Sequence, residues 1–407
     1  MKPFENLTVL DFTQFTSGPM CTSIMGDLGA EVIKIENPPY GDNNRYNPPS
    51  KNKNTCYISS LDHNKRSVLL NLKDERQKEI FFKMVETADV VVENFKAGTM
   101  EKFGCGYEKL KEINPQIVFA SISGFGQTGP WKSRAAYDVV VQAVSGLMSV
   151  TGEKGGRPLR FGVSMADVTS GLMACVATLA ALYDAKRTGV GRYIDLGMMD
   201  NVFALLEQPV TSYGITGIAA KPNGNRHPSA VPFAAFSCKR RVQVVICAFT
   251  DHDFAALCKI LGYPEISDNP KFLTRNLRFK HEDECYDILC DLVKDWDAQE
   301  LIEELNAKGI VCAKVNKVSE VYNMEQVAVR NMIVDAKWPD GTKVKIPGQP
   351  IKLSDMEEVA EYPVSPLGYD TIEVLSRYEE TQIIHEIFDP ILKESAELAA
   401  VRSEHLN

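Results

Sequence analysis

The chain has 407 residues, of which 44% are hydrophobic and 24% charged, and its net charge is −9 at pH 7. This length predicts two to three structural units and excludes a disulfide-stapled miniprotein or a single small binding module. The composition is that of an ordinary globular protein, and the acidic balance argues against a nucleic-acid-coating protein or a polybasic membrane anchor.

The first third of the chain alternates short β-branched runs with amphipathic stretches. The strand-like runs are Leu7–Leu10, Glu31–Ile35, Ser67–Leu70, Val90–Val92 and Ile117–Ala120. Strands that alternate with helices are typical of a parallel α/β sheet.

A long helix is predicted over residues 167–187. Leu172, Val176, Leu179 and Leu182 share one face of this helix, and alanines nearly fill the other faces. We therefore expect the helix to be buried on most sides.

After Leu206 the residue composition changes: turn-forming residues cluster in the segments 213–217 and 221–225, which is typical of a linker. A second unit is predicted beyond this linker, with a strand at Val242–Ile246, helices near 251–260, 279–292 and 297–307, and the run Ile310–Val315. Asp340-Gly341 lies between two strand-like runs and predicts a hairpin, and an amphipathic helix is expected at the end of the chain.

The ten cysteines are scattered without a C-x-x-C pair, which favours a reduced, cytoplasmic compartment. The first residues lack a basic leader and an apolar h-region, and no run approaches the ~18 apolar residues of a transmembrane helix. The six histidines lie far apart, so the sequence indicates no metal site. We expect a soluble intracellular protein without nucleic-acid or membrane partners.

Gly124–Gly129 forms a literal G-x-G-x-x-G motif after a predicted strand. A dinucleotide site also needs a helix directly behind the motif and an acidic residue ~20 positions later. The segment Pro130–Arg134 interrupts the first requirement, and Glu153, in a turn, does not meet the second. The motif therefore does not indicate a nicotinamide or flavin site.

Three polar regions allow both a structural and a functional interpretation. Asp167 opens the long helix, where an aspartate serves as an N-cap or, kept ionised by the oriented amides, as a nucleophile. Asn94–Gly98 follows a strand at the sheet edge where α/β proteins bind ligands, although a plain helix-entry loop fits as well. Asn64–Arg66 and Lys73 suit either solvated charge or phosphate contact.

The sequence resembles the family III CoA-transferases, the CaiB/BaiF group that includes the formyl-CoA transferases. The resemblance spans nearly the whole chain. It rests on Leu10–Phe12, Gly29–Glu36, Asn64–Ser67, Glu93–Phe95, Gly124–Pro130, Ala166-Asp167, Pro366–Gly368 and Thr371–Leu375.

The resemblance implies an α/β fold with a large Rossmann-like parallel-sheet domain built from both chain ends and a smaller α/β domain. Each subunit would be a ring, and two rings would interlock in a homodimer. On this basis we predict that residues 1–205 form the N-terminal part of the large CoA-binding domain, 229–315 the small domain, and 336–407 the C-terminal part of the large domain. Residues 206–228 and 316–335 would be linkers.

The resemblance also implies an acyl-CoA:carboxylate CoA-transferase that uses acyl-CoA and a small carboxylic acid, with CoA thioesters as substrates and no permanently bound cofactor. Asp167 would be the covalent nucleophile, forming a mixed anhydride and then an aspartyl-CoA thioester. The implied CoA-binding residues are Leu70, Lys73, Asn94, Phe95, Lys102 and Tyr137. The implied substrate and lid residues are Thr16, Gly224, Asn225, Arg226 and His227.

Two other functions stay open from the sequence. One is an α-methylacyl-CoA racemase, which shares the fold but carries a histidine where this chain has Tyr137; the other is a noncatalytic CoA-binding protein. The lid segment lacks the glycine run of oxalate-using members, and this departure argues against formyl-CoA:oxalate exchange. The acyl donor and the acceptor acid are not specified by the sequence.

Overall fold

The computed structural model describes residues 2–406. By its internal contacts the chain divides into two compact units: unit 1 contains residues up to 147, residues 160–214 and residues from 325 onward, and unit 2 contains residues 148–159 and 215–324. The borders after 214 and 324 lie inside the predicted linkers 206–228 and 316–335. Residues 148–159, which the sequence analysis assigned to the large domain, group with unit 2.

Unit 1 is built on a six-stranded parallel sheet. Its strands, in chain order, are β1 (Thr8–Asp11), β2 (Glu31–Glu36), β5 (Lys65–Leu69), β6 (Val90–Glu93), β7 (Val118–Ser123) and β8 (Tyr193–Gly197). The spatial order is β5-β2-β1-β6-β7-β8, so the strand order reverses between β1 and β6. This is the doubly wound arrangement, in which ligands bind beyond the carboxyl ends of the strands at the reversal point.

Five of these strands agree with the predicted ones, and β8 is the strand that the sequence analysis missed. β1, β6 and β7 are almost entirely buried, which explains their continuous β-branched runs. β8 lies at the sheet edge with Tyr193 and Asp195 exposed, so its sequence lacks such a run.

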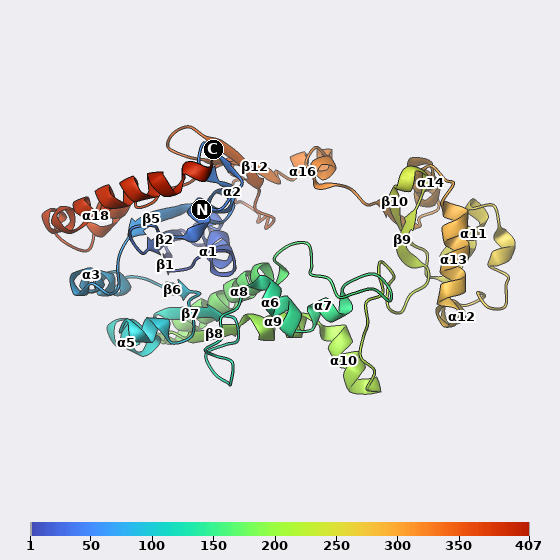
Figure 1. Ribbon diagram of the computed structural model, residues 1–407, viewed down its shortest axis with the longest axis horizontal. Helices are drawn as coiled ribbons and strands as arrows, with labels where there is room; N and C mark the ends of the chain where they lie inside the picture. The colour runs from blue at the N-terminus through green and yellow to red at the C-terminus, as the bar shows by residue number, and fades with distance from the viewer. Residues whose placement is uncertain (1, 407) are drawn as a thin grey trace. The chain divides into compact units, whose positions relative to one another are not determined.

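Helices cover both faces of the sheet (Figure 1). One apolar core packs the sheet against α3 (Glu75–Val85), α5 (Tyr107–Ile113), α17 (Thr371–Leu375) and α18 (Thr381–Arg402). The core on the other face contains α1 (Ser17–Asp27), α8 (Met165–Thr188) and α9 (Met198–Leu205). The C-terminal helices α17 and α18 thus pack in the same layer as α3 and α5, so unit 1 contains residues from both ends of the chain.

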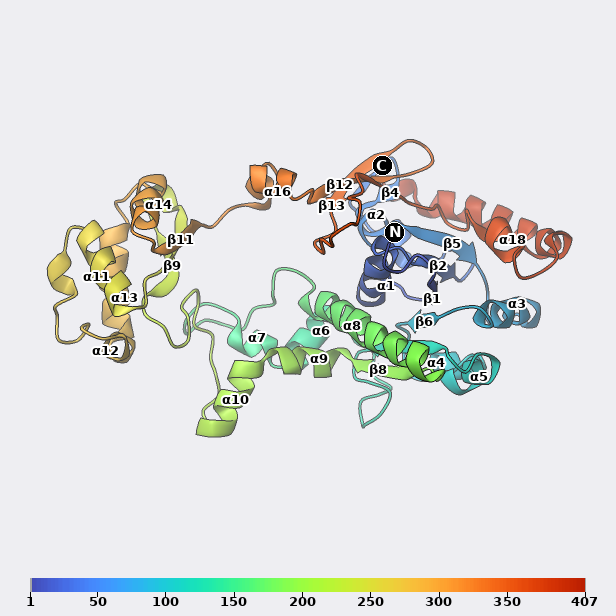
Figure 2. The same ribbon diagram turned by 180° about the vertical axis from the view of Figure 1, so that it is seen from behind.

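Small residues let α8 pack closely on α1 (Figure 2). Gly171 lies directly against Ser17 and Met20, and the Cys175 thiol interacts with that of Cys21. Because the residue numbers rise together on both helices, α1 and α8 run parallel, and their first turns lie at the same end of the pair.

The expectation that α8 is buried on most sides is wrong in part. Its buried positions are mostly small residues such as Ala174 and Ala181, whereas Leu172 and Val176 of the predicted leucine-rich face are exposed. Close helix approach favours small side chains, so the inner face of α8 is the one with the least apolar bulk.

Further elements of unit 1 surround this sheet. They are α2 (Cys56–Leu61), α4 (Thr99–Lys102), α6 (Asp138–Val144), α16 (Glu325–Val329), the pair β3 (Ser50–Lys51) and β4 (Asn54–Thr55), and the sheet of β12 (Ile333–Lys337), β13 (Lys343–Pro347) and β14 (Glu361–Pro363). The predicted hairpin at Asp340-Gly341 is confirmed, because β12 and β13 pair antiparallel across it and Gly341 has a φ of 82°.

Unit 2 has an antiparallel sheet in the order β11-β10-β9, covered by helices. Its elements are β9 (Phe233–Ser237), β10 (Gln243–Cys247), α11 (Asp251–Ile260), α12 (Arg275–Lys280), α13 (Glu282–Val293), α14 (Ala298–Ala307), β11 (Val311–Lys314) and α15 (Val318–Val321). The predicted strand, helices and final run of this region are confirmed. At the unit borders lie α7 (Leu147–Val150) and α10 (Glu207–Thr216).

Among the described residues, α8 is the helix whose length and hydropathy would suffice to cross a membrane, with a mean hydropathy of 1.6 over its most apolar stretch. Such a helix was not expected from the sequence. Core helices of soluble proteins also reach these values, and the inner face of α8 packs on α1 and the sheet. Its length and composition are therefore weak evidence for a membrane span.

Candidate active site

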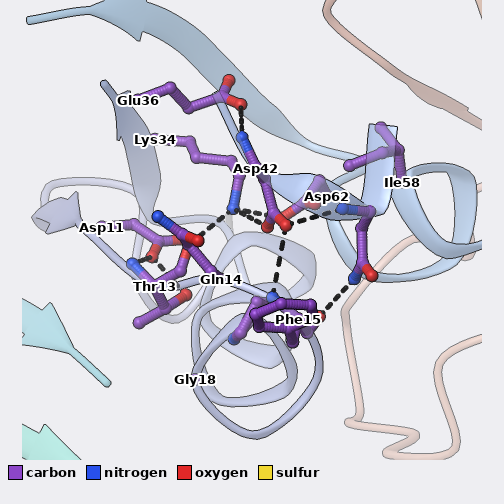
Figure 3. Close-up of polar contacts among 12 residues, drawn as sticks. Asp11, Thr13, Gln14, Phe15, Gly18, Lys34, Glu36, Asp42, Ile58 and Asp62 are labelled. Carbon is purple, nitrogen blue, oxygen red and sulfur yellow. Dashed lines mark hydrogen bonds and ion pairs between the residues drawn. The ribbon is translucent and has the colours of Figure 1, made fainter. Parts of the chain in front are cut away.

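The loop after β1 rests on a buried cluster of charged side chains (Figure 3). The Lys34 ammonium group donates to the Thr13 carbonyl at 2.8 Å and lies 3.0 Å from the Asp42 carboxylate and 3.2 Å from that of Asp62. Lys34, Asp42 and Asp62 are all nearly inaccessible to solvent. Buried charges are costly unless paired and hydrogen-bonded, so this network commits several charges to holding one loop.

Opposing effects set the protonation of this cluster. Burial alone would raise the pKa of Asp11, but Lys65, Lys34 and the hydroxyls of Thr13 and Thr22 outweigh it and hold the pKa at about 2. At Asp42, burial together with repulsion from nearby carboxylates outweighs Lys34, and the pKa is raised. Asp11, directly beneath the loop, is therefore a fixed negative charge near neutral pH.

The supported loop contains a residue in a strained conformation. Phe15 has a φ of 63°, a value rare for residues other than glycine. Its N–H donates to Asp42 at 3.3 Å and its carbonyl accepts from the Asn44 amide at 2.6 Å. A residue held in such a conformation by several contacts is a feature of functional sites.

Asn94 ties this loop to the end of β6. Its side-chain oxygen accepts from the Gln14 N–H at 2.8 Å and its amide donates to the Gln14 carbonyl at 2.7 Å. A further hydrogen bond reaches the Ser17 hydroxyl at 3.2 Å. The side chain of Asn94 thus bridges the two strands between which the strand order reverses.

Asp167 lies at the same end of unit 1. Because α1 and α8 run parallel, the first turn of α8, which contains Asp167, adjoins the first turn of α1 and the loop before it. Ser164 occupies the N-cap position, so the interpretation of Asp167 as an N-cap is wrong. Within residues 2–406 the Asp167 carboxylate has no hydrogen bond or ion pair, and burial, aided by the charge of Asp138, raises its pKa to about 7.

An aromatic pair lies beside these elements. Tyr137 directly precedes α6, is 66% exposed, and meets Phe15 edge to face with 6.1 Å between ring centroids. Asp138, the next residue, accepts a hydrogen bond from the Ala166 N–H at 2.9 Å. Unit 1 thereby brings together Tyr137, Asn94 and Asp167 of the predicted site, along with the loop that contains Thr16.

The glycine motif has a structural role that the sequence did not suggest. The Gln127 side chain accepts from the Gly98 N–H at 3.3 Å and donates to the Ser121 hydroxyl at 2.6 Å, while its own N–H donates to Asp195. It thereby ties the loop after β6 to β7 and β8. Gln127 also lines a cavity of about 730 Å³ together with Gly98, and burial raises the pKa of the nearby Glu93 to about 7.

The remaining predicted CoA-binding residues have different environments. Leu70 is 2% exposed and its side chain packs in the apolar core. Phe95 is half-buried against the same core. Lys73 and Lys102 are exposed, and neither ammonium group has a partner among the described residues.

The predicted lid residues belong to unit 2. Gly224 has a φ of 61°, Asn225 is exposed, and the His227 ring stacks on Phe233 with a centroid distance of 4.8 Å. Arg226 pairs with Asp283 at 2.5 Å and lies over the Tyr286 ring at 4.3 Å. Arg226 is therefore neither a freely solvated charge nor an open cation.

Sequence analysis missed four residues that shape this region: Phe15, Lys34, Gln127 and Asp138. An aromatic residue in the polar run Thr13–Ser17 and a lysine inside the β-branched run of β2 are unusual patterns that could have drawn attention to Phe15 and Lys34. Gln127 lies within the Gly124–Gly129 motif and Asp138 follows Tyr137, but their roles depend on Gly98, Asp195 and Ala166, which lie far along the chain. Among residues 2–406, no group of three or more His, Cys, Asp or Glu side chains is placed to hold a metal ion.

Comparison with known proteins shows the family to which this chain belongs. The model of CoA-transferase family III matches residues 4–371. The acetyl-CoA:oxalate CoA-transferase of Acetobacter aceti is 38% identical over 89% of this chain and 92% of its own length. The succinyl-CoA:glutarate CoA-transferase of Mus musculus is 37% identical over 94% of this chain and 88% of its own.

A solved structure of the same family also matches this chain. A CaiB/BaiF family protein from Brucella suis superimposes with a TM-score of 0.82 at 32% identity, covering 93% of this chain and 99% of its own. The mixed α/β fold and its six-stranded parallel sheet match that structure. The chain is an enzyme of the CoA-transferase class. It belongs to CoA-transferase family III, as the resemblance predicted.

Proposed function

We propose that this enzyme is an acyl-CoA:carboxylate CoA-transferase that forms a covalent intermediate on Asp167. The observation that carries the proposal is the state of that carboxylate, which is half-buried and unpartnered in the first turn of α8, with its pKa raised to about 7. Near neutral pH a large fraction is ionised, and the raised pKa makes the carboxylate more basic than an ordinary aspartate.

In the first step an Asp167 oxygen attacks the thioester carbonyl of the donor. A C–O bond forms, the C–S bond breaks, and CoA leaves as a thiolate with the bonding electron pair. The thiolate then attacks the Asp167 carbonyl of the mixed anhydride, releasing the donor acid as its carboxylate and leaving an aspartyl-CoA thioester. The acceptor carboxylate repeats both steps in reverse and regenerates Asp167.

The anhydride must be shielded from water, and the developing oxyanion needs hydrogen-bond donors. We assign shielding to the loop of Gly224, Asn225, Arg226 and His227. The N–H groups of Gly224, Arg226 and His227 already donate to the carbonyls of Gly152, Asn223 and Phe233, so the Asn225 N–H is the donor that this loop would offer to the oxyanion. Because Arg226 is paired with Asp283, this proposal rests on the loop backbone rather than on a free arginine. Thr16, at the start of α1, would face the acyl group.

For CoA itself, we assign the phosphates to the unpartnered ammonium groups of Lys73 and Lys102. Phe95 and Tyr137 would contact the adenine and the pantetheine. Leu70 and Asn94 would take part through the backbone and through loop support, since the Leu70 side chain is in the core and that of Asn94 is hydrogen-bonded to Gln14.

The acceptor is proposed to be a small dicarboxylic acid. The relatives from Acetobacter aceti and Mus musculus are named for oxalate and glutarate, respectively. Both acids carry a second carboxylate, which a cationic or amide-rich subsite would recognise.

A homodimer is proposed as the working form, with the two ring-shaped subunits interlocked. The support within this chain is the outer face of α8, where Leu172, Met173, Val176 and Tyr183 are exposed. Contiguous exposed apolar side chains of this kind mark interaction surfaces. A cytoplasmic location is proposed because all ten cysteines are free thiols. Light scattering and fractionation, respectively, test these two proposals.

The mechanism is tested by isotope exchange. The protein is mixed with acetyl-CoA or succinyl-CoA and with labelled oxalate or glutarate, and label is sought in a new thioester. Asp167→Asn is expected to reduce exchange by ~10³-fold or more, whereas Asp184→Asn, the same change at the far end of α8, should leave it unchanged.

Trapping of the covalent intermediate gives a second, independent test. Mass spectrometry of the working enzyme should find CoA or acyl mass on the peptide that contains Asp167. The mechanism would be refuted if Asp167→Asn exchanged label as fast as the wild-type enzyme and if no mass were added to that peptide in the wild-type enzyme. Deuterium uptake at the acyl α-carbon without exchange would favour the racemase instead.

A further inference from the structure

Asp138 is a buried carboxylate outside the proposed chemistry. It is the first residue of α6, is 7% exposed, and uses both oxygens. One oxygen accepts from the Ala166 N–H at 2.9 Å, and the other accepts from the Gln142 side-chain amide at 2.7 Å. Ala166 directly precedes Asp167, so Asp138 holds the backbone of the residue next to the proposed nucleophile.

Gln142 adds hydrogen bonds to the loop before α8. Its side-chain oxygen accepts from the Phe161 N–H at 2.8 Å, and its amide approaches the Val163 carbonyl at 3.5 Å. Together with the Asp138 contact, the loop is anchored at residues 161, 163 and 166. We call Asp138, Gln142 and these three backbone positions the α6 clamp.

The clamp fixes the start of α8 without making a hydrogen bond to the Asp167 side chain. The Asp167 carboxylate has no such bond within the described residues, although the amides at a helix start readily bind carboxylates. Asp138 occupies the Ala166 amide and thereby removes one donor that Asp167 could otherwise approach. Asp167 is left unpartnered and available to a substrate.

Few charged groups lie around the Asp167 carboxylate. Asp138 of α6 acts on Asp167 electrostatically, and Arg160 reaches Asp138 from the preceding loop at 4.0 Å. The neighbouring elements contribute uncharged groups: α1 presents Ser17 to the first turns of α8, and α9 presents the Asn201 amide to the hydroxyls of Thr169 and Ser170. Asp138 is thus the negative charge that bears on Asp167.

This charge favours reaction for a physical reason. Asp167 loses its negative charge when its oxygen bonds to the acyl carbon, while the electron pair of the breaking C–S bond leaves on the CoA sulfur. Repulsion by Asp138 raises the energy of the ionised ground state and is relieved as that bond forms. Only interactions that differ between ground and transition state change the rate of the chemical step.

We propose that Asp138 is a positioning residue for CoA transfer, which holds the first turn of α8 through the α6 clamp and keeps Asp167 unpartnered and strongly nucleophilic. The inference rests on the proposed function, because it takes Asp167 as the nucleophile. It assigns no substrate contact to Asp138.

Two variants distinguish the effect of the Asp138 charge from that of the α6 clamp. Asp138→Asn removes the charge and one acceptor. Gln142→Met removes the anchors at 161 and 163 and one hydrogen bond to Asp138, but keeps the charge. For Asp138→Asn we expect kcat to fall about 10- to 100-fold, since a misplacement of ~1 Å costs ~10²-fold. The acid limb of its pH–rate profile should move to lower pH, because the Asp138 charge adds to burial in raising the pKa of Asp167. For Gln142→Met we expect a smaller fall in kcat and an unchanged acid limb.

A readout without activity separates this inference from the mechanism itself. The Asp167 carboxyl is titrated by ¹³C NMR in the substrate-free enzyme, with its resonance assigned by its loss in Asp167→Asn. We expect the Asp167 titration to move to lower pH in Asp138→Asn and to stay in place in Gln142→Met and in the control Asp184→Asn.

If Asp138→Asn leaves both kcat and the Asp167 titration unchanged while Asp167→Asn is inactive, the positioning role is wrong and the mechanism stands. If Asp167→Asn remains active, the mechanism fails whatever Asp138 does. Should Asp138→Asn not fold, Gln142→Met decides the matter, because an unchanged kcat in that variant overturns the clamp.

Discussion

The close approach of α1 and α8 is the feature on which the site geometry depends, and Gly171→Ala probes it directly. A Cβ at position 171 would lie 2.7 Å from the Cβ of Met20 and closer still to the Ser17 carbonyl oxygen. Contacts below 3.0 Å are essentially absent for real Cβ atoms, and the Ser17 oxygen belongs to backbone that cannot rotate away. The added methyl group must therefore push the two helices apart.

Two effects of opposite sign determine the stability change. Replacing glycine by alanine inside a helix favours folding by about 0.5–1 kcal/mol. Overpacking a close contact costs about 1–3 kcal/mol. Because the overpacking cost outweighs the gain in helix propensity, Gly171→Ala should destabilise the protein by about 1–2 kcal/mol. Gly214→Ala is the matched control: that glycine also lies in a helix, α10, but has open space around its Cβ position, and the substitution should stabilise by up to about 1 kcal/mol.

The assay is urea denaturation followed by far-UV circular dichroism, combined with isotope exchange for kcat. Gly171→Ala should lower the midpoint of unfolding and reduce kcat, because the first turn of α8 moves away from the loop that contains Phe15. Gly214→Ala should raise or preserve the midpoint and leave kcat unchanged. A Gly171→Ala protein at least as stable as the unmodified one, with the same kcat, would refute the argument that this contact sets the site.

Two further outcomes are expected. Gln127→Ala should raise the KM for acyl-CoA about 10-fold with little change in kcat, because the loop after β6 loses its tie to Ser121; Gln116→Ala, an exposed change, is the control, and equal KM values would contradict this role. Burial would raise the pKa of Glu36, but Arg45 outweighs it and holds the pKa at about 2, against an ordinary 4.5. The stability contributed by this pair is therefore present above pH 4.5 and lost as pH falls toward 2. Glu36→Gln, which leaves Arg45 buried and unpaired, should cost about 3–5 kcal/mol at pH 7 and flatten the pH dependence of unfolding in that window. The control Glu373→Gln changes an exposed ion pair and should cost much less. Similar losses for both variants would show that burial does not strengthen the Glu36–Arg45 pair.

Patterns within short stretches of sequence were sufficient for much of the fold. β1, β6 and β7 are buried on both faces, so their sequences are continuous β-branched runs. The extent of α8, the helices of unit 2 and the hairpin at Asp340-Gly341 follow from local periodicity and turn chemistry in the same way. The edge strand β8 escaped prediction because Tyr193 and Asp195 are exposed and its sequence lacks a continuous β-branched run.

Asp167, Thr16, Asn94 and Tyr137 could be named from residue blocks alone, but their roles depend on contacts between distant segments. Asn94 holds Gln14 across 80 residues of chain, and Asp138 holds Ala166 across 28. No local pattern distinguishes an asparagine that binds a loop from one that binds a ligand. The same limit explains why the residue blocks did not show that the Leu70 side chain lies in the apolar core.

The amino-acid sequence by itself therefore determined the class of fold, the family and the aspartate on which the chemistry is proposed to occur, because secondary structure and motif chemistry are encoded over a few neighbouring residues. Only the tertiary structure decided which face of α8 is buried and which charges support the loop before α1. It also decided why Asp167 is left without a partner. These properties arise where parallel helices and strand ends meet, and such meetings depend on packing between segments that the chain order keeps far apart.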